Sequence, residues 1–254
     1  MKKNWNIRKE VKWTVSLLLL LGLIIFAERK RGEIVCKDIV VQLDNVVENH
    51  FMSEAQALQV VEAGQPKLRG KSFSDIDLKD FETRLLANKH VKDAELFSDL
   101  KGNLIVNVEL RRPVARLVRE DGPDAYIAED GTVMPVSENF TARVLIISGS
   151  YVKTIIDQGS LNSFDEGKQL MAMIEFINAD DFWRAQASQL DIDSKGKISI
   201  IPQVTSQVVE FGQPVNIEDK FAKLKVFYKK ILPQMGWTKY ERVSLEYEGQ
   251  VVAE

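Results

Sequence analysis

An uncharged stretch of fifteen residues near the start of the chain limits its possible folds more than any other feature. Residues 13–27 read WTVSLLLLLGLIIFA, and charged residues border the stretch on both sides. As a helix the stretch rises about 22 Å, which is less than the roughly 30 Å hydrocarbon core of a bilayer. This length fits either the apolar part of a cleaved signal peptide or a retained membrane anchor.

The residues that follow the stretch favour an anchor. Ala27 runs directly into Glu28-Arg29-Lys30-Arg31, which leaves no small-x-small cleavage site. Lys12 and Arg29 can extend toward the headgroups and lengthen the span. Five Lys or Arg residues precede the stretch and three follow it, which favours a cytoplasmic N-terminus. We therefore predict a basic cytoplasmic tail over 1–12, a single transmembrane signal anchor over 13–27 and a juxtamembrane linker over 28–34.

Composition narrows the classes of function. The chain has 254 residues, of which 45% are hydrophobic and 28% charged, so the part outside the membrane can bury a core. A net charge of −3 with interspersed signs argues against nucleic-acid binding. Cys36 is the only cysteine, so it could pair with another chain, carry a lipid or simply be a half-buried thiol. No Cys/His pair has metal-ligand spacing, and we predict neither a metal nor a cofactor.

Residues 35–112 predict a small α+β domain. Ser53-Glu54-Ala55-Gln56 is a capping box for a helix that ends at Gly64. Asp77 caps a second helix, and Asn88 is expected to stop it in a left-handed conformation. The apolar face of this second helix is Leu78, Phe81, Leu85 and Leu86. Strands are expected over 36–43, 91–97 and 104–110, which gives the order β-α-α-β-β.

Pro113 marks the start of a second domain, because proline cannot donate to a central strand ladder. We predict a mostly antiparallel sheet over 113–254 with helices packed on it. Its strands are expected over 115–118, 125–128, 132–136, 144–147, 190–193, 198–202 and 207–211. Ser163 is expected to cap a helix whose core residues are Leu170, Met173, Ile174 and Ile177. Asn216 is expected to cap another helix, which Pro233 is expected to stop. The polar face of that last helix is Lys220, Lys223, Lys225, Lys229 and Lys230.

Five short motifs lie along most of the chain, in the same order as the elements predicted above. They are Asn88-Lys89-His90-Val91, Leu110-Arg111-Arg112-Pro113-Val114-Ala115, Ala128-Glu129-Asp130-Gly131-Thr132-Val133, Leu145-Ile146-Ile147-Ser148-Gly149 and a terminal segment over 243–252. Together with the order of the elements, these motifs resemble the bacterial cell-division family FtsQ/DivIB, in which a POTRA domain precedes a β domain. The resemblance implies a POTRA-like domain over 35–112 and an FtsQ-type β domain over 113–254.

The residues themselves offer little catalytic chemistry. The acidic stretch of Asp121, Asp124, Glu129 and Asp130 could supply a carboxylate pair, but Asp-Gly steps are ordinary turn chemistry. The serines lack a nucleophile-elbow context, and neither phosphate-binding nor dinucleotide-binding glycine motifs occur. We therefore predict no enzymatic activity and no small-molecule substrate.

The remaining candidate is a surface that binds protein. Residues 240–252 alternate polar and apolar side chains and predict a strand, which could be an open sheet edge or an interior strand. Val243, Leu245 and Tyr247 match the family's terminal motif, while Arg242, Glu246 and Glu248 form the opposite face. The full set of candidate partner-binding residues is Tyr240, Arg242, Val243, Leu245, Glu246, Tyr247, Glu248, Val251 and Val252.

The resemblance implies a non-catalytic scaffold of the division site. Such a protein would cross the inner membrane once, place most of its chain in the periplasm and bind bitopic division proteins of the FtsB/FtsL type. A POTRA-type chaperone or transport module is an alternative, although we find no second β-α-α-β-β copy. A membrane-anchored envelope enzyme that uses the acidic stretch is a second alternative, which a pocket with converging carboxylates would support.

Overall fold

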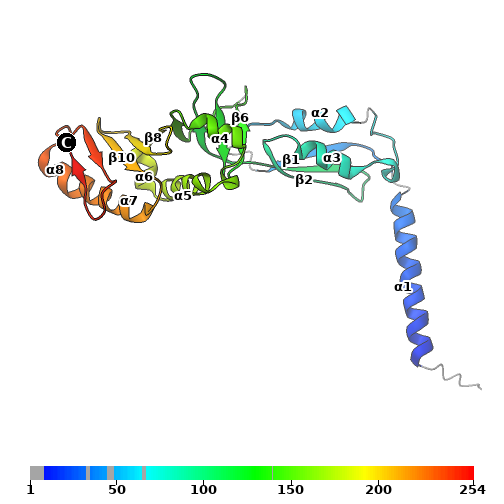
Figure 1. The fold of residues 1–254 in the computed structure, drawn as a ribbon. Helices are drawn as coiled ribbons and strands as arrows, with labels where there is room; N and C mark the ends of the chain where they lie inside the picture. The colour runs from blue at the N-terminus through cyan, green and yellow to red at the C-terminus, as the bar shows by residue number, and fades with distance from the viewer. Residues whose placement is uncertain (1–8, 33–34, 45–48, 65–66, 139) are drawn as a thin grey trace, which may run out of the picture. The chain divides into compact units, whose positions relative to one another are not determined.

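The structure is a computed structural model that describes residues 9–32, 35–44, 49–64, 67–138 and 140–254 (Figure 1). The predicted basic tail therefore lies mostly outside the described residues. A 24-residue helix, α1 (Lys9–Gly32), contains the apolar stretch. Within the described part of the chain, no helix has both the length and the apolar character needed to cross a membrane.

The chain divides into two compact units. Described residues of the segments 1–44, 53–87 and 93–108 belong to the first unit, and those of 45–52, 88–92 and 109–254 to the second. The two units are considered separately below.

The first unit contains a three-stranded sheet with strand order β1-β3-β2. Its elements are β1 (Ile39–Asp44), α2 (Glu54–Gly64), a short turn η1 (Phe73–Asp75), α3 (Leu78–Leu86), β2 (Val91–Ser98) and β3 (Leu104–Leu110). Every second residue of β3, from Leu104 to Leu110, is buried, as the alternation predicts. The predicted β-α-α-β-β order is confirmed.

Local capping explains where the helices of this unit begin. Ser53 and Gln56 form the predicted reciprocal cap, because the Ser53 N–H donates to Gln56 Oε1 (2.9 Å) and the Gln56 N–H to Ser53 Oγ (3.2 Å). Asp77 caps α3 by accepting from the Asp80 N–H (3.2 Å). The predicted left-handed stop at Asn88 is wrong, since Lys67 and Asn216 are the described non-glycine residues with positive φ. Leu86 is also exposed rather than buried.

The second unit is built on a nine-stranded sheet with the order β12-β11-β10-β9-β8-β7-β4-β5-β6 among the described residues. Its strands are β4 (Pro113–Leu117), β5 (Ala125–Ala128), β6 (Val133–Pro135), β7 (Leu145–Ser148), β8 (Ala187–Ile192), β9 (Ile198–Pro202), β10 (Val208–Gly212), β11 (Arg242–Ser244) and β12 (Val252–Ala253). Five neighbouring pairs are antiparallel, so the predicted mostly antiparallel sheet is confirmed. The pairs β4/β7, β7/β8 and β10/β11 are parallel.

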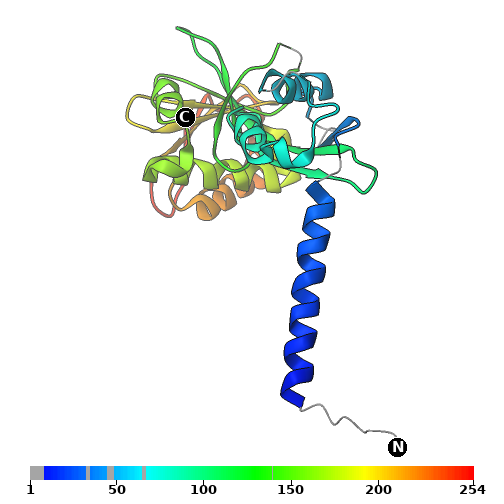
Figure 2. The same ribbon diagram turned by 90° about the vertical axis from the view of Figure 1, so that its right-hand side faces the viewer.

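Helices cover the large sheet and close its core. They are α4 (Val152–Gln158), a turn η2 (Leu161–Ser163), α5 (Asp165–Ala179), α6 (Asp181–Gln186), α7 (Ile217–Val226), the π-helical turn η3 (Phe227–Ile231) and α8 (Leu232–Met235). Helices α5 and α7 lie side by side (Figures 1 and 2), and Phe176 stacks on Phe221 with ring centroids 4.9 Å apart. The predicted core residues of α5 are all buried: Leu170, Met173, Ile174 and Ile177.

Two predicted helix boundaries in this unit are wrong. Ser163 does not cap α5, because it lies in the preceding turn and its hydroxyl donates to the Ser160 carbonyl (2.6 Å). Pro233 does not stop the helix that follows Asn216, because it lies in the first turn of α8, where a proline needs no N–H. The short helices α4 and α6 were not predicted.

The terminal segment differs most from expectation. Residues 240–252 do not form one strand, because Gly249 adopts a positive φ of 71° and the chain reverses there. The segment instead makes two short antiparallel strands, β11 and β12. Strand β11 lies between β10 and β12, and β12 is the outermost strand.

Candidate partner-binding edge of the large sheet

The outer side of β12 is an open edge of the sheet. Among the residues that the structure describes, strand β12 pairs with β11 alone, through the registers Val243↔Ala253 and Ser244↔Val252. Glu254 and Arg242 exchange backbone hydrogen bonds, with the Glu254 N–H donating at 3.0 Å and the Arg242 N–H at 3.2 Å. Because an antiparallel ladder alternates, the N–H and C=O of Ala253 and Val251 point away from β11. These backbone groups are the ones that a further strand would bind.

Four of the predicted site residues support this edge from beneath. Val243 and Leu245 are fully buried in the core, so they cannot contact a partner directly. Tyr240 and Val251 are partly buried against the same core, and the Tyr240 ring lies 5.8 Å from that of Phe227. These side chains hold β11 and β12 in place.

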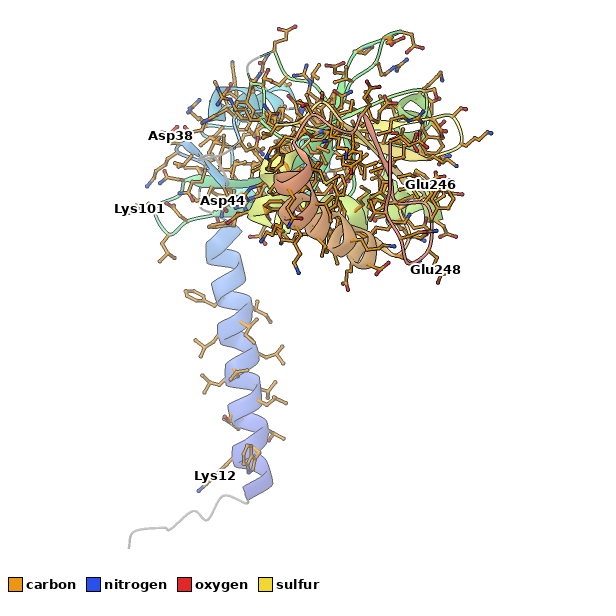
Figure 3. The ribbon with its side chains drawn as sticks, turned by 90° about the vertical axis from the view of Figure 1, so that its left-hand side faces the viewer. Lys12, Asp38, Asp44, Lys101, Glu246 and Glu248 are labelled. Atoms are coloured by element: carbon orange, nitrogen blue, oxygen red, sulfur yellow. The ribbon has the colours of Figure 1, made fainter. Side chains whose placement is uncertain are left out.

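The remaining predicted residues lie on more accessible surface. Arg242 is exposed and forms an ion pair with Glu210, and Val252 is half-buried on β12. Glu246 accepts from Lys197 Nζ at 2.9 Å. Tyr247 is 54% exposed and Glu248 is exposed, and both precede Gly249 in the turn. Figure 3 labels Glu246 and Glu248. The structure thus brings all nine residues into one hairpin and separates them into supporting and accessible groups.

Lys220 supports the same region, although we expected it on a solvated face. It is buried, and its Nζ donates to the carbonyls of Phe211 (2.8 Å) and Gln213 (2.9 Å). Burial lowers the pKa of Lys220, while the charge of Glu246 acts in the opposite direction. Periodicity missed this role because it groups Lys220 with the other lysines of α7 and carries no information about the carbonyls at and after the end of β10. A hollow of about 970 Å³ lies between the start of α7 and the hairpin turn.

The opposite edge of the sheet, formed by β6, is closed. Pro135 ends β6 and has no N–H to offer a further strand. The Pro135 carbonyl lies 2.9 Å from His90 Nε2 and is therefore already occupied. His90 in turn stacks on the Phe51 ring at 5.0 Å. Burial lowers the pKa of His90, and the nearby Arg111 charge adds to this effect.

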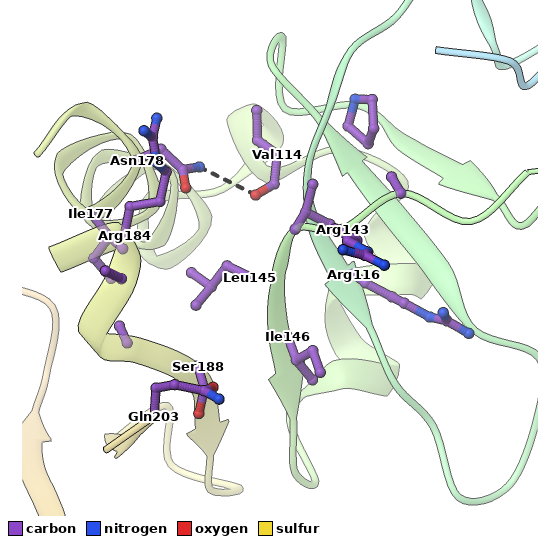
Figure 4. Close-up of a pocket in the computed structure, with 15 residues that line it drawn as sticks. Val114, Arg116, Arg143, Leu145, Ile146, Ile177, Asn178, Arg184, Ser188 and Gln203 are labelled. Atoms are coloured by element: carbon purple, nitrogen blue, oxygen red, sulfur yellow. Dashed lines mark hydrogen bonds between the residues drawn. The ribbon is translucent and has the colours of Figure 1, made fainter. Parts of the chain in front are cut away.

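A groove of about 710 Å³ opens where β7 starts later than its neighbours β4 and β8 (Figure 4). Its lining includes Arg116, Arg143 and Arg184 and no carboxylate. Arg116 is paired with Asp124 (2.6 Å) and Arg184 with Asp181 (2.6 Å). The groove can attract carboxylates, but none of its lining residues is a histidine, cysteine or acid that could transfer a proton or act as an activated nucleophile.

The carboxylates of the acidic stretch are engaged in separate ion pairs. Asp121 pairs with Arg119 (3.0 Å), Asp130 with Arg111 (2.8 Å) and Glu129 with Lys92 (3.2 Å). The hydrogen bond from Arg119 lowers the pKa of Asp121. Burial acts to raise the pKa of Asp130, but hydrogen bonds from Arg111 and Thr132 outweigh it and lower the pKa. A proton donor would need a raised pKa, so this stretch does not favour the enzyme alternative.

In the part of the chain that the structure describes, no group of three or more histidine, cysteine, aspartate or glutamate side chains could hold an ion. Cys36 is buried, and burial raises the pKa of its thiol, which makes it a poor nucleophile.

Comparison with known families agrees with this architecture. A POTRA-like domain model matches residues 34–109. The family model described as FtsQ/DivIB, C-terminal related, matches residues 112–254, which is more than half of the chain. A comparison with individual curated proteins gives no match. On the strength of the family match and the order of the two domains, the chain belongs to the FtsQ/DivIB family.

Proposed function

We propose that this chain is a non-catalytic scaffold of the bacterial division site that binds other division proteins by strand addition at β12. Membership of the FtsQ/DivIB family supports the cell-division role. The separate ion pairs of the acidic stretch are consistent with a protein that does not turn over a substrate. The partners would be bitopic proteins of the FtsB/FtsL type.

We also propose that residues 13–27 anchor the chain in the inner membrane, with the N-terminus in the cytoplasm and residues 35–254 in the periplasm. The support for this is the uncharged apolar sequence, the excess of basic residues before it and the helical conformation of α1. The described side chains of this helix between Val11 and Phe26 are exposed, as they would be if lipid covered them.

One observation carries the binding proposal: the two edges of the large sheet differ. At β6 the proline and the contact with His90 leave little for a partner strand to bind. At β12 the outward N–H and C=O groups of Ala253 and Val251 remain unpaired by any described strand. Backbone bonds there would supply affinity, and the accessible side chains of Arg242, Tyr247 and Glu248 would supply specificity.

A proline substitution tests the edge directly. In the full chain, Ala253→Pro removes the outward N–H without removing a ladder bond to β11, so partner binding should weaken at least tenfold, the equivalent of about 1.4 kcal/mol. Ala253→Ser keeps the N–H and is the matched control, which should bind as the unchanged chain does. Binding is measured by titration with the periplasmic segments of FtsB/FtsL-type proteins.

The folded state of each variant is checked by its melting temperature, which should stay within a few degrees because the altered N–H faces outward. Equal affinity of the proline and serine variants, with both folded, would remove strand addition at β12. No binding by the unchanged, folded chain would remove the scaffold proposal itself.

A further inference from the structure

A hairpin in the first unit presents an apolar tip that its own fold does not need. The tip comprises residues 97–103, which are the last two residues of β2 and the turn that leads to β3. Leu100 is fully exposed, with a relative exposure of 102%, and Phe97 is 42% exposed. Asp99 fixes the turn, because its carboxylate accepts from the N–H groups of Lys101 (2.8 Å) and Asn103 (2.7 Å). The turn thus holds Leu100 outward without giving it a packing partner.

The tip lies at the end of the sheet where the chain enters the unit. The Lys37 N–H donates to the Gly102 carbonyl (2.8 Å), and the Leu104 N–H donates to the Asp38 carbonyl (2.8 Å). Strands β1 and β3 therefore start at the same end of the sheet. The turn between β2 and β3 projects beyond that end, opposite to the direction in which β1 runs; Asp38, just before β1, and Lys101, in the turn, mark this end in Figure 3.

Chain length ties this end to the end of the apolar stretch. Residues 27–32 belong to α1 and rise about 8 Å. Three further Cα steps reach Val35 and span at most about 11 Å. Val35 forms a bridge with Ser72, and Cys36 pairs with residues 70 and 71 next to it. The entry end of the sheet therefore lies within about 19 Å of the last apolar residue.

The charges at this end suit a headgroup layer. Lys37, Arg69, Lys71 and Lys101 gather there. Asp38 and Glu62 oppose them but are paired with Arg69 at 2.9 Å and 3.4 Å. Asp99 directs its carboxylate into its own turn, and the hydrogen bond from the Asn103 backbone leads the contacts that lower its pKa. Basic side chains around an exposed leucine match an anionic lipid surface.

We propose that the hairpin tip is a second membrane contact, in which Leu100 inserts into the headgroup region beside the basic side chains at this end of the sheet. This inference rests on the membrane anchor of the proposed function. The contact would give the first unit a second point of attachment to the bilayer and so restrict its orientation.

Depth-dependent fluorescence quenching tests the contact in the full chain. The protein carries Cys36→Ala and one new labelled cysteine, in vesicles of phosphatidylcholine with phosphatidylglycerol as the minor lipid. An NBD label at Lys101→Cys reports on the tip. A label at Leu86→Cys, the last residue of α3, reports on an exposed leucine outside the tip. A label at Leu20→Cys reports on the anchor. We expect shallow brominated lipid to quench the Lys101 label, deep brominated lipid to quench the Leu20 label and neither to quench the Leu86 label.

Substitution of the leucine separates insertion from mere proximity. With the label at Lys101→Cys, Leu100→Asp should reduce lipid quenching to the level seen at Leu86 and increase quenching by aqueous iodide. Leu86→Asp is the matched control and should leave the Lys101 label quenched by lipid. Both leucines are exposed, so neither substitution should unfold the unit.

The outcomes distinguish the two proposals. If iodide quenches the Lys101 label as strongly as the Leu86 label while deep brominated lipid quenches the Leu20 label, the tip contact is overturned but the anchor is not. A Leu20 label that deep brominated lipid does not quench overturns the anchor and, with it, the tip contact.

Discussion

His90, which belongs to the second unit, meets the edge strand β6 of that unit as a neutral side chain. Its ring stacks on Phe51 and meets the Pro135 carbonyl, while Arg111 lies close enough to disfavour a second positive charge. The pKa of His90 in the folded protein is therefore lower than in the unfolded chain, where it is about 6.5. The unfolded chain takes up the proton first as the pH falls, so protonation favours unfolding.

We expect the free energy of unfolding to fall as the pH decreases from 7 through about 6.5 and on to the lower pKa of the folded protein. His90→Gln keeps a side chain that can donate to the Pro135 carbonyl and should flatten this slope. The measurement is urea denaturation at a series of pH values between about 7 and 5, where the unfolded histidine titrates. His50→Gln, which keeps His90, is the matched control, and an unchanged slope in His90→Gln would contradict the assignment.

The junction of α7, β10 and the terminal hairpin depends on the buried ammonium group of Lys220. Lys220→Met keeps most of the side-chain volume but leaves the carbonyls of Phe211 and Gln213 without their donor. We expect a loss of about 2 kcal/mol in the free energy of unfolding, because buried acceptors would lose hydrogen bonds to a charged donor. Lys230→Met, on the exposed side of η3, is the control and should change stability by less than about 0.5 kcal/mol. Equal effects in the two variants would refute the role of Lys220.

Strands and helices with strong local signals were predictable from the sequence. The alternation over 104–110 gave β3 with its exact bounds, and the capping boxes at Ser53 and Asp77 located α2 and α3. Most predicted strand ends lie within three residues of the observed ones. These signals depend on neighbouring residues, so they do not require knowledge of the tertiary contacts.

Elements whose form depends on distant contacts were not predictable. A two-residue periodicity extends from Tyr240 to Val252, yet the turn at Gly249 lets β12 fold back and pair with β11. The parallel pairing of β4, β7 and β8 joins strands that are separated by helices. The candidate site was found in the correct segment, but the burial of Val243, Leu245 and Lys220 became evident only from the tertiary packing.

The two proposed contacts lie on different compact units: the strand-addition edge on the second and the hairpin tip on the first. Variants of the two contacts should therefore act independently, because sites with no shared partners are normally additive. Leu100→Asp should leave the affinity for FtsB/FtsL-type segments unchanged, and Ala253→Pro should leave the Lys101 label quenched by lipid. The double variant should show both losses without a further effect; loss of partner affinity in Leu100→Asp alone would show that the contacts are coupled.

The unequal margins of the nine-stranded sheet also bear on how large an assembly can become. Repeated growth by strand addition requires each subunit to pair with a neighbouring strand at both edges of its sheet. Here Pro135, with its carbonyl engaged by His90, seals one flank. Strand addition to this sheet at β12 would consequently stop after a single addition, so that this sheet would cap one strand and would not seed a fibre.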